Sequence, residues 1–243
     1  MKILEITNVD FSLRHFLLPL MRALRTRGHD VVGVCAEGPL LADVRAEGFR
    51  VIAAPFARRV SPLAHWRAFN ALVVLMRAER PDLVHAHMPI SSFLARLAAW
   101  RAGVPRIAFT CHGFLFNNAQ AAWPQRTASF AMEWLGGRVT DVFLTVSTEE
   151  AADARRLGIA ALQGGEQRLM LAARDLPGLR RIARDERARA RDEGSHPQPE
   201  RFDQRRERLV VGHAVDLEMK RPIQFTVLLA VVDRDRRAHR LVQ

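Results

Sequence analysis

The sequence predicts an α/β fold, a doubly wound parallel sheet, for residues 1–158. Short runs of nearly continuous apolar residues recur there, and stretches with helical spacing separate them. Strands covered by helices on both faces are apolar along their length, and alternating strands and helices build a parallel sheet. Six strands are expected, at Lys2–Thr7, Asp30–Cys35, Arg50–Ala53, Leu83–Ala86, Arg106–Thr110 and Val142–Val146.

Apolar residues at three- and four-residue spacing predict amphipathic helices between these strands. Three of the helices end before Gly28, Pro81 and Gly103, residue types that commonly follow a helix. The apolar faces comprise Phe16, Leu17, Leu20, Met21 and Leu24, then Ala68, Leu72, Leu75 and Met76, then Phe93, Leu94, Leu97 and Ala98.

The composition is strongly basic, with a formal net charge of +11 and a pI of about 11.3. This charge suits anionic partners such as sugar phosphates, acidic lipid or nucleic acid, although a GC-rich genome would also produce an arginine-rich chain. Phe202 and Phe225 are the only aromatic residues after residue 160. A base-stacking surface is therefore poorly supported, and no nucleic-acid partner is expected, although an anionic-polymer binder remains a third class.

Several features predict a cytoplasmic protein without a metal or other cofactor. Cys35 and Cys111 lie in strand-like runs and form no CxxC pair, so they are expected to be buried thiols. The charged run Met1–Thr7 resembles a strand rather than a signal peptide. The basic and aromatic segment 58–69 suits a peripheral membrane contact, but an amphipathic helix packed on the sheet is the favoured interpretation.

The composition of the sequence and its strand–helix pattern change near Gly158. Charged residues number 31 among the 83 residues from Ala161 onward, against 32 among the first 160. No strand–helix alternation is evident from Ala161 to Asp192, and Pro197 and Pro199 mark a break. We therefore expect a domain over 1–158, followed by an irregular arginine-rich tail over 159–243 that is disordered or a frameshift product.

Two strand ends carry histidines followed by proline or glycine. One reads His85-Ala86-His87-Met88-Pro89, and the other Thr110-Cys111-His112-Gly113. Ligands bind beyond the carboxyl ends of parallel strands, so His87 and His112 are expected to face one crevice. Of His85 and His87, one is expected to point into the sheet packing and the other to the opposite face or into the cleft, and His85 is expected to be a satisfied buried histidine. His112 is the stronger ligand candidate, because Gly113 lets the backbone approach a ligand, although a merely capping role is the alternative.

The loop after the first strand supplies further candidates: Thr7, Asn8, Asp10 and Phe11. A helix opening near Leu13 would add free N–H groups, which bind anions. An ordinary helix cap by Asp10 or Ser12 is equally compatible. Arg14 and His15 would oppose the dipole of the first helical turn, so they could contact a phosphate or a sugar hydroxyl, or form a solvated pair.

These residues resemble the N-terminal domain of family 4 glycosyltransferases. The resemblance rests on Lys2–Thr7, on Arg27-Gly28-His29-Asp30-Val31, and on the two histidine-bearing strand ends. It implies one Rossmann-like half of a GT-B fold, which binds the acceptor, whereas a second domain binds the nucleotide-sugar. It also implies a retaining transfer without a metal, in bacterial surface polysaccharide synthesis on lipid carriers.

By this resemblance, His112 corresponds to the family histidine at the reaction centre, with His87 beside it. Thr7 to Phe11 and Gly113 would line the acceptor side. The donor domain's usual start and its paired glutamates eight residues apart do not follow residue 158. We therefore expect a glycosyltransferase whose donor domain is truncated or replaced, acting on a nucleotide-sugar and a saccharide or lipid-linked acceptor. The alternative is a non-catalytic acceptor-binding module or an inactive remnant.

Overall fold

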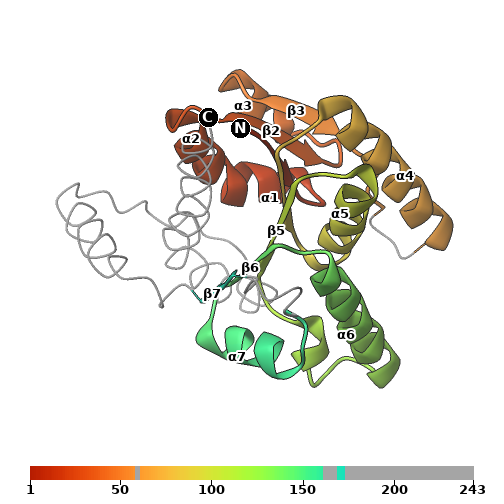
Figure 1. The fold of residues 1–243 in the computed structure, drawn as a ribbon. Coiled ribbons are helices and arrows are strands. Elements are labelled where there is room, and N and C mark those ends of the chain that lie inside the picture. The colour runs from red at the N-terminus through yellow and green to blue at the C-terminus, as the bar shows by residue number, and fades with distance from the viewer. Residues whose placement is uncertain (58–60, 161–168, 173–243) are drawn as a thin grey trace, which may run out of the picture. The chain divides into compact units, whose positions relative to one another are not determined.

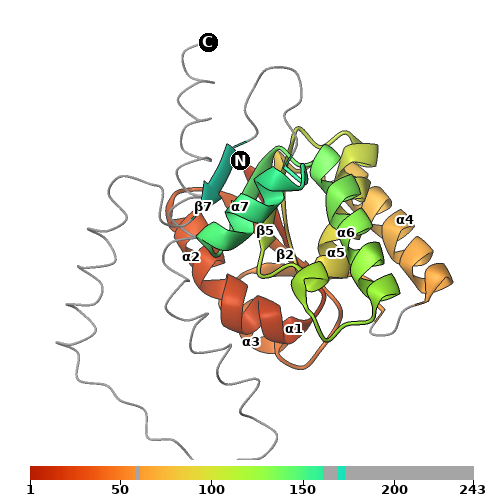
Figure 2. The same ribbon diagram turned by 90° about the horizontal axis from the view of Figure 1, so that it is seen from below.

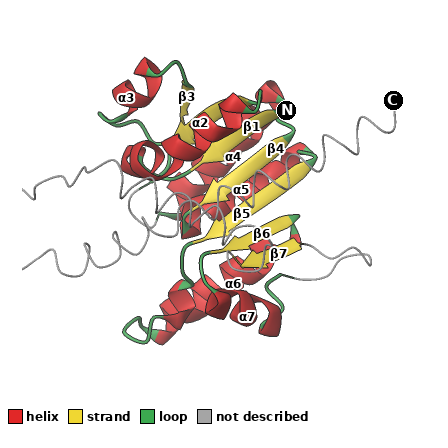
Figure 3. Ribbon diagram, turned by 90° about the vertical axis from the view of Figure 1, so that its left-hand side faces the viewer, coloured by secondary structure: helices red, strands yellow, loops and turns green. Residues whose placement is uncertain are grey.

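A computed structural model describes residues 1–57, 61–160 and 169–172, which form a seven-stranded parallel sheet with helices on both faces (Figures 1 and 3). The strand order is β3-β2-β1-β4-β5-β6-β7. The predicted doubly wound fold is confirmed. The strands are β1 (Lys2–Ile6), β2 (Asp30–Cys35), β3 (Arg50–Ala53), β4 (Leu83–His87), β5 (Arg106–Cys111), β6 (Val142–Thr145) and β7 (Leu169–Ala172).

The strand order reverses between β1 and β4. The chain first builds outward from β1 through β2 to β3, and it then returns to place β4 on the other side of β1. Ligands of open parallel sheets bind beyond the carboxyl ends of the strands at such a reversal. The ends of β1 and β4 therefore define where a site is expected.

The helices follow local sequence signals. Ser61 accepts a hydrogen bond from the Ala64 N–H at the start of α4, and Ser147 accepts one from Glu150 at the start of α7. α5 ends at Gly103, whose φ of 76° suits glycine. The elements are α1 (Asp10–Ser12), the π-helix η1 (Leu13–Leu17), α2 (Leu18–Thr26), α3 (Leu41–Ala46), α4 (Pro62–Glu79), α5 (Pro89–Ala102), the 3₁₀-helix η2 (Leu115–Asn117), α6 (Trp123–Arg138) and α7 (Thr148–Arg156).

The two faces of the central strands differ in chemistry. Helices α4, α5 and α6 lie together on one side of the strands, and α2 lies on the other (Figure 2). Leu4, Ile6, Val84 and Ala86 pack with α4 and α5 in one apolar core. On the opposite face, a Cβ at Gly33 would lie 2.9 Å from a Leu13 methyl group, so η1 packs closely there. The residues that alternate with the apolar core, including Glu5 and His85, face this second side.

One short strand lies within the expected tail. β7 pairs in parallel with β6, so the sheet continues past residue 158. The first compact unit runs from Met1 to Ala172. Four apolar residues inside an arginine-rich stretch gave no periodic signal, and only pairing with β6 identifies them as a strand. The other expectations for the tail concern residues outside the described ranges and stay predictions.

The segment expected either at a membrane or on the sheet is also partly described. Residues 58–60 lie outside the described ranges, and Pro62–Glu79 forms α4, which packs on the sheet through Ala68, Leu72 and Met76. Trp66 is 61% exposed. Packing on the sheet, the favoured interpretation, is therefore confirmed for the described part.

Candidate functional site

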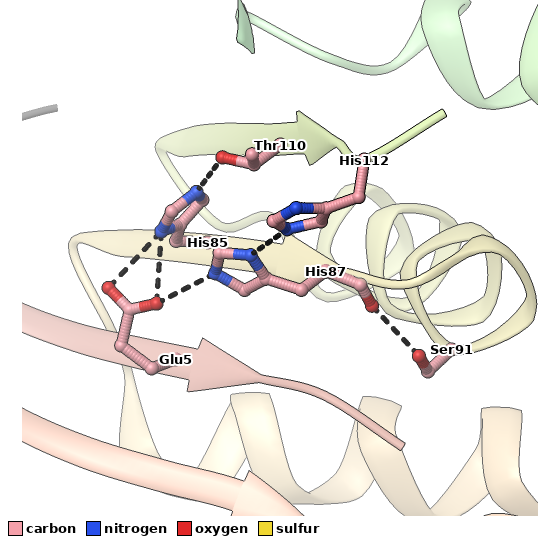
Figure 4. Close-up of polar contacts among 6 residues, drawn as sticks. All are labelled: Glu5, His85, His87, Ser91, Thr110 and His112. Carbon is pink, nitrogen blue, oxygen red and sulfur yellow. Dashed lines mark hydrogen bonds and ion pairs between the residues drawn. The ribbon is translucent and has the colours of Figure 1, made fainter. Parts of the chain in front are cut away.

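A buried polar cluster lies at the ends of β1, β4 and β5, where the strand order reverses (Figure 4). Glu5 on β1 lies opposite His85 on β4 in the strand register, and His87 follows two residues later. Glu5, His85 and His87 are each at most 3% exposed. The cluster therefore occupies the position that the sheet topology assigns to a ligand site, on the polar face of the strands.

Glu5 binds both histidines of β4. Its Oε2 lies 2.9 Å from His85 Nδ1 and 3.1 Å from His87 Nε2. His85 Nε2 in turn lies 2.8 Å from Thr110 Oγ1 on β5. One carboxylate thus joins three strands, and both nitrogens of His85 are used inside the protein. The expectation that His85 is a satisfied buried histidine is confirmed.

His87 connects this cluster to His112. His87 Nδ1 lies 3.5 Å from His112 Nε2, and the ring centroids are 5.8 Å apart. His112 is half-buried, because it follows the end of β5. The two histidines that are expected to face one crevice are in contact with each other. The expectation that His85 and His87 face different ways is wrong, because residues two apart on a strand share a face.

The turn after His87 has a strained backbone. Met88 adopts a φ of 68°, which is uncommon for a residue with a side chain. Pro89 then opens α5, and the Ser91 hydroxyl donates a 2.8 Å hydrogen bond to the His87 carbonyl oxygen. These contacts fix the end of β4 and so the direction of the His87 ring.

The cluster combines one anionic group with two neutral rings. Burial raises the pKa of Glu5, but His85 and His87 outweigh it and hold this pKa at about 2. Burial, with a contribution from His85, lowers the pKa of His87 to about 3 against the opposing effect of Glu5. Burial and His85 lower the pKa of His112 to about 4. Near neutral pH, Glu5 is therefore ionised, whereas His87 and His112 are uncharged.

Glu5, His85 and His87 are also the group in the described residues whose donor atoms lie close enough together to hold a metal ion, within 4.8 Å of one another. Each of these donor atoms already takes part in a hydrogen bond within the cluster. A metal would have to replace the protons in those bonds. The arrangement is complete as a hydrogen-bonded network.

The loop after β1 contributes buried oxygen atoms. Thr7 Oγ1 and Asn8 Oδ1 are buried and have no hydrogen-bond partner among the described residues. Buried polar atoms are nearly always paired, so such atoms at a strand end indicate contact with a ligand or water. Asp10 is engaged differently: its Oδ2 accepts a 3.1 Å hydrogen bond from the Leu40 N–H. It therefore holds the loop after β2.

The cap expected from Asp10 or Ser12 is not formed. Val9 occupies the N-cap position of α1 and gives no side-chain cap bond. Instead, a Cβ at Gly38 would lie 2.1 Å from Asp10 Oδ2, so the carboxylate packs directly on the glycine backbone. Asp10 accepts a hydrogen bond from the loop after β2 because that loop lies within hydrogen-bond distance of its carboxylate. The local sequence around Asp10 does not show that this loop is close.

Phe11, Arg14 and His15 lie toward the surface of the same segment. The Phe11 and His15 rings are 4.5 Å apart, and Phe11 is 51% exposed. Arg14 Nε lies 3.0 Å from Asp43, and both side chains are partly exposed. Arg14 and His15 belong to the π-helix η1 rather than to the first turn of an α-helix, and π-helical turns occur often at functional sites.

Gly113 follows His112 with a φ of 127°, a backbone conformation that favours glycine. A Cβ there would lie 3.6 Å from a Glu150 oxygen, which is an ordinary contact. The backbone conformation, rather than the space, requires glycine at this position. The exposed turn at Gly113 then leads into η2, where Phe114 and Phe116 stack with centroids 4.7 Å apart.

Sequence reasoning missed Glu5, the centre of the cluster. The residue is fully buried between Leu4 and Ile6 in β1, an interior strand of the sheet. A charged residue in a strand that is covered on both faces needs a partner of opposite or complementary character. The charge of Glu5 inside an apolar run, together with the two histidines at the end of another strand, was the sequence signal that could have identified this cluster.

Structural comparison assigns the described fold to a known class. The chain superposes on the UDP-GlcNAc 2-epimerase of Neisseria meningitidis with a TM-score of 0.53, at 12% identity, over 76% of this chain and 50% of that one. It superposes on Anabaena Alr3699/HepE with a TM-score of 0.52, at 13% identity, over 71% of this chain and 43% of that one. The fold is the Rossmann-like half of a GT-B protein.

The sequence comparisons identify the family within that class. The model of Glycosyltransferase Family 4 matches residues 15–163, and the chain belongs to this family. It is similar to a UDP-Gal:α-D-GlcNAc-diphosphoundecaprenol α-1,3-galactosyltransferase of Escherichia coli, with 29% identity over 44% of this chain and 27% of the relative. EpsD of Bacillus subtilis, named as a glycosyltransferase, is 28% identical over 64% of this chain and 40% of that protein.

The matched part of this chain therefore spans less than half the length of either relative. Among the described residues, no helix is both long and apolar enough to cross a membrane.

Proposed function

We propose that this chain supplies the acceptor side of a retaining glycosyltransferase. The reaction moves a hexosyl or N-acetylhexosaminyl group from a nucleotide-sugar to a saccharide or lipid-linked acceptor, in surface polysaccharide synthesis. The main supporting observation is the position of His112, which Glu5 and His87 hold from inside the sheet at the reversal of strand order. The family relationship supports the same reaction.

The residues of the crevice take complementary parts in this proposal. His112 contacts the reacting sugars, and as an uncharged ring it can accept or donate a hydrogen bond. Thr7 and Asn8 contact acceptor hydroxyls through their buried oxygens, with Gly113 allowing close approach. The surface residues Phe11, Arg14 and His15 border the acceptor, and His87 and Asp10 hold the walls of the crevice.

A lipid-linked acceptor is favoured by exposed apolar residues that follow the carboxyl ends of the strands. Phe11 follows β1, Leu63 follows β3, and Leu115 and Trp123 both follow β5. They are 51%, 60%, 42% and 77% exposed, in that order. The Escherichia coli relative is named for a diphosphoundecaprenol acceptor. Exposed apolar residues beside a polar crevice suit an acceptor with a sugar head and a lipid tail, held peripherally at a membrane surface.

Binding of such an acceptor is the direct test. The full chain would be titrated with a polyprenyl diphosphate-linked GlcNAc in detergent micelles, beside the same sugar diphosphate without the lipid. Trp123→Ala should weaken binding of the lipid-linked compound several-fold. Trp100→Ala is the matched control. Trp100 is also exposed, at 64%, but it lies near the C-terminal end of α5, whereas Trp123 is the first residue of α6. The Trp100→Ala variant should therefore bind as the wild type does. Equal binding with and without the lipid would contradict a lipid-linked acceptor.

Transfer requires a donor site as well, because the reacting groups must be held together. The family's donor motifs do not appear after residue 158. We expect very slow transfer by this chain alone and restored transfer when a family 4 donor domain is added as a separate polypeptide. His112→Ala should abolish the restored activity, whereas Trp100→Ala should not. Rapid transfer by the chain alone would show that its own tail binds the donor.

A further inference from the structure

The contacts of Glu5 determine which ring nitrogens carry protons. An ionised carboxylate only accepts hydrogen bonds, so both ring nitrogens that face Glu5 must donate. His85 Nδ1 and His87 Nε2 lie 2.9 Å and 3.1 Å from its Oε2. Each of these two nitrogens therefore carries a hydrogen.

The proton on His87 Nε2 determines the state of its other nitrogen. The low pKa of His87, about 3, keeps the ring uncharged near neutral pH, so Nδ1 holds a lone pair. The atom that faces this lone pair is His112 Nε2, which lies 3.5 Å from His87 Nδ1. A favourable contact between the two nitrogens requires a hydrogen on His112 Nε2. His112 is also uncharged, with a pKa of about 4, and its Nδ1 then holds a lone pair.

We propose that Glu5 is a positioning residue that acts through His87 to fix His112 as the Nε2–H tautomer, with Nδ1 as a hydrogen-bond acceptor. A ligand group that meets Nδ1 must then donate a hydrogen bond, which a sugar hydroxyl does and a phosphate oxygen does not. This specificity for hydroxyl donors rests on the proposed function. The assignment of the tautomers does not depend on that function, because it follows from the contacts of Glu5 with His87 and of His87 with His112.

The branch through His85 provides an internal control. His85 Nε2 lies 2.8 Å from the Thr110 hydroxyl oxygen, and this branch ends there. Thr110→Val removes that contact without touching the path from Glu5 through His87 to His112. Glu5→Leu removes both carboxylate oxygens in a side chain of similar size, so neither His85 Nδ1 nor His87 Nε2 keeps its acceptor and the tautomer of His87 is no longer fixed.

The test is side-chain nitrogen NMR of the full chain labelled at histidine, at pH 7. In the wild type, we expect His87 and His112 both as neutral Nε2–H tautomers. Glu5→Leu should abolish the single pattern of His112 and produce the Nδ1–H form, whereas Thr110→Val should leave His112 unchanged. Circular dichroism and the thermal midpoint establish that each variant is folded.

The wild-type spectrum keeps the proposal falsifiable even where Glu5→Leu does not fold. An Nδ1–H tautomer or an imidazolium at His112 in the wild type overturns it, as does a folded Glu5→Leu variant with an unchanged His112. Stoichiometric binding of added Zn²⁺ that shifts His85 and His87 together and requires Glu5 also overturns it, because the cluster would then be a metal site. A failed transfer assay with the expected tautomers would instead contradict only the proposed function.

Discussion

The two faces of strands β1 and β4 bury side chains of opposite chemistry. On one face, Leu4, Ile6, Val84 and Ala86 pack against α4 and α5 as an apolar core. On the other, Glu5, His85 and His87 are equally buried but joined by hydrogen bonds. The apolar face needs only volume and shape, whereas the polar face needs each donor matched to an acceptor. The stabilising core and the candidate site are thus adjacent residues of the same strands.

Glu5→Ala should give the largest effect on stability. It removes the common acceptor of His85 and His87 and leaves two buried donors without their partner, at a cost of about 4 kcal/mol. Chemical denaturation of the full chain would measure the loss. The nearby Leu4→Ala should also destabilise, but through a cavity. A loss below about 1 kcal/mol for Glu5→Ala would mean that the histidines find other partners.

Acid should destabilise the polar face of the strands but not the apolar face, which contains no titrating group. His87 has a folded pKa of about 3, below its ordinary value of 6.5, so the unfolded chain binds its proton more readily. Stability is therefore greatest above pH 6.5 and falls as pH declines toward 3, by about 3 kcal/mol at pH 4. His112 and Glu5 change stability in the same direction, Glu5 only below its ordinary pKa of 4.5.

Denaturation curves at several pH values would show this slope. Leu4→Ala should lower the whole profile without changing its shape between pH 7 and 4, because no titrating group is lost. A flat wild-type profile across that range would contradict the buried, uncharged state of His87.

The same contrast explains what the sequence could predict. The strands and helices were predictable because apolar runs and helical spacing are local, and the ends differ by only one or two residues. The order of the strands depends on pairing between distant segments, as β1 with β4, and local patterns do not contain it. Glu5 was visible as a charge inside an apolar run, but its partners lie 80 and 82 residues away.

Thr110→Val should have a smaller effect than the loss of Glu5. The hydroxyl oxygen lies 2.8 Å from His85 Nε2, and valine has nearly the same shape. The variant leaves one buried ring nitrogen without its hydrogen-bond partner, at a cost of about 1 kcal/mol. Thermal and chemical denaturation would measure this loss of stability. An unchanged midpoint would indicate that His85 Nε2 finds another partner in place of Thr110.

Thr7→Val makes the same substitution at the end of β1, and we expect the opposite sign. Thr7 is fully buried, and its Oγ1 has no partner among the described residues, so removing it ends the burial of an unpaired hydroxyl. The variant should be as stable as the wild type or more stable, by up to about 1 kcal/mol. If Thr7 contacts the acceptor as proposed, the same variant should bind the lipid-linked sugar diphosphate more weakly. Thr110→Val should lower stability and leave that binding unchanged. Comparing the two variants therefore distinguishes a hydroxyl that stabilises the fold, at Thr110, from one that binds a ligand, at Thr7. A clear loss of stability in Thr7→Val would show that its hydroxyl already has a structural partner.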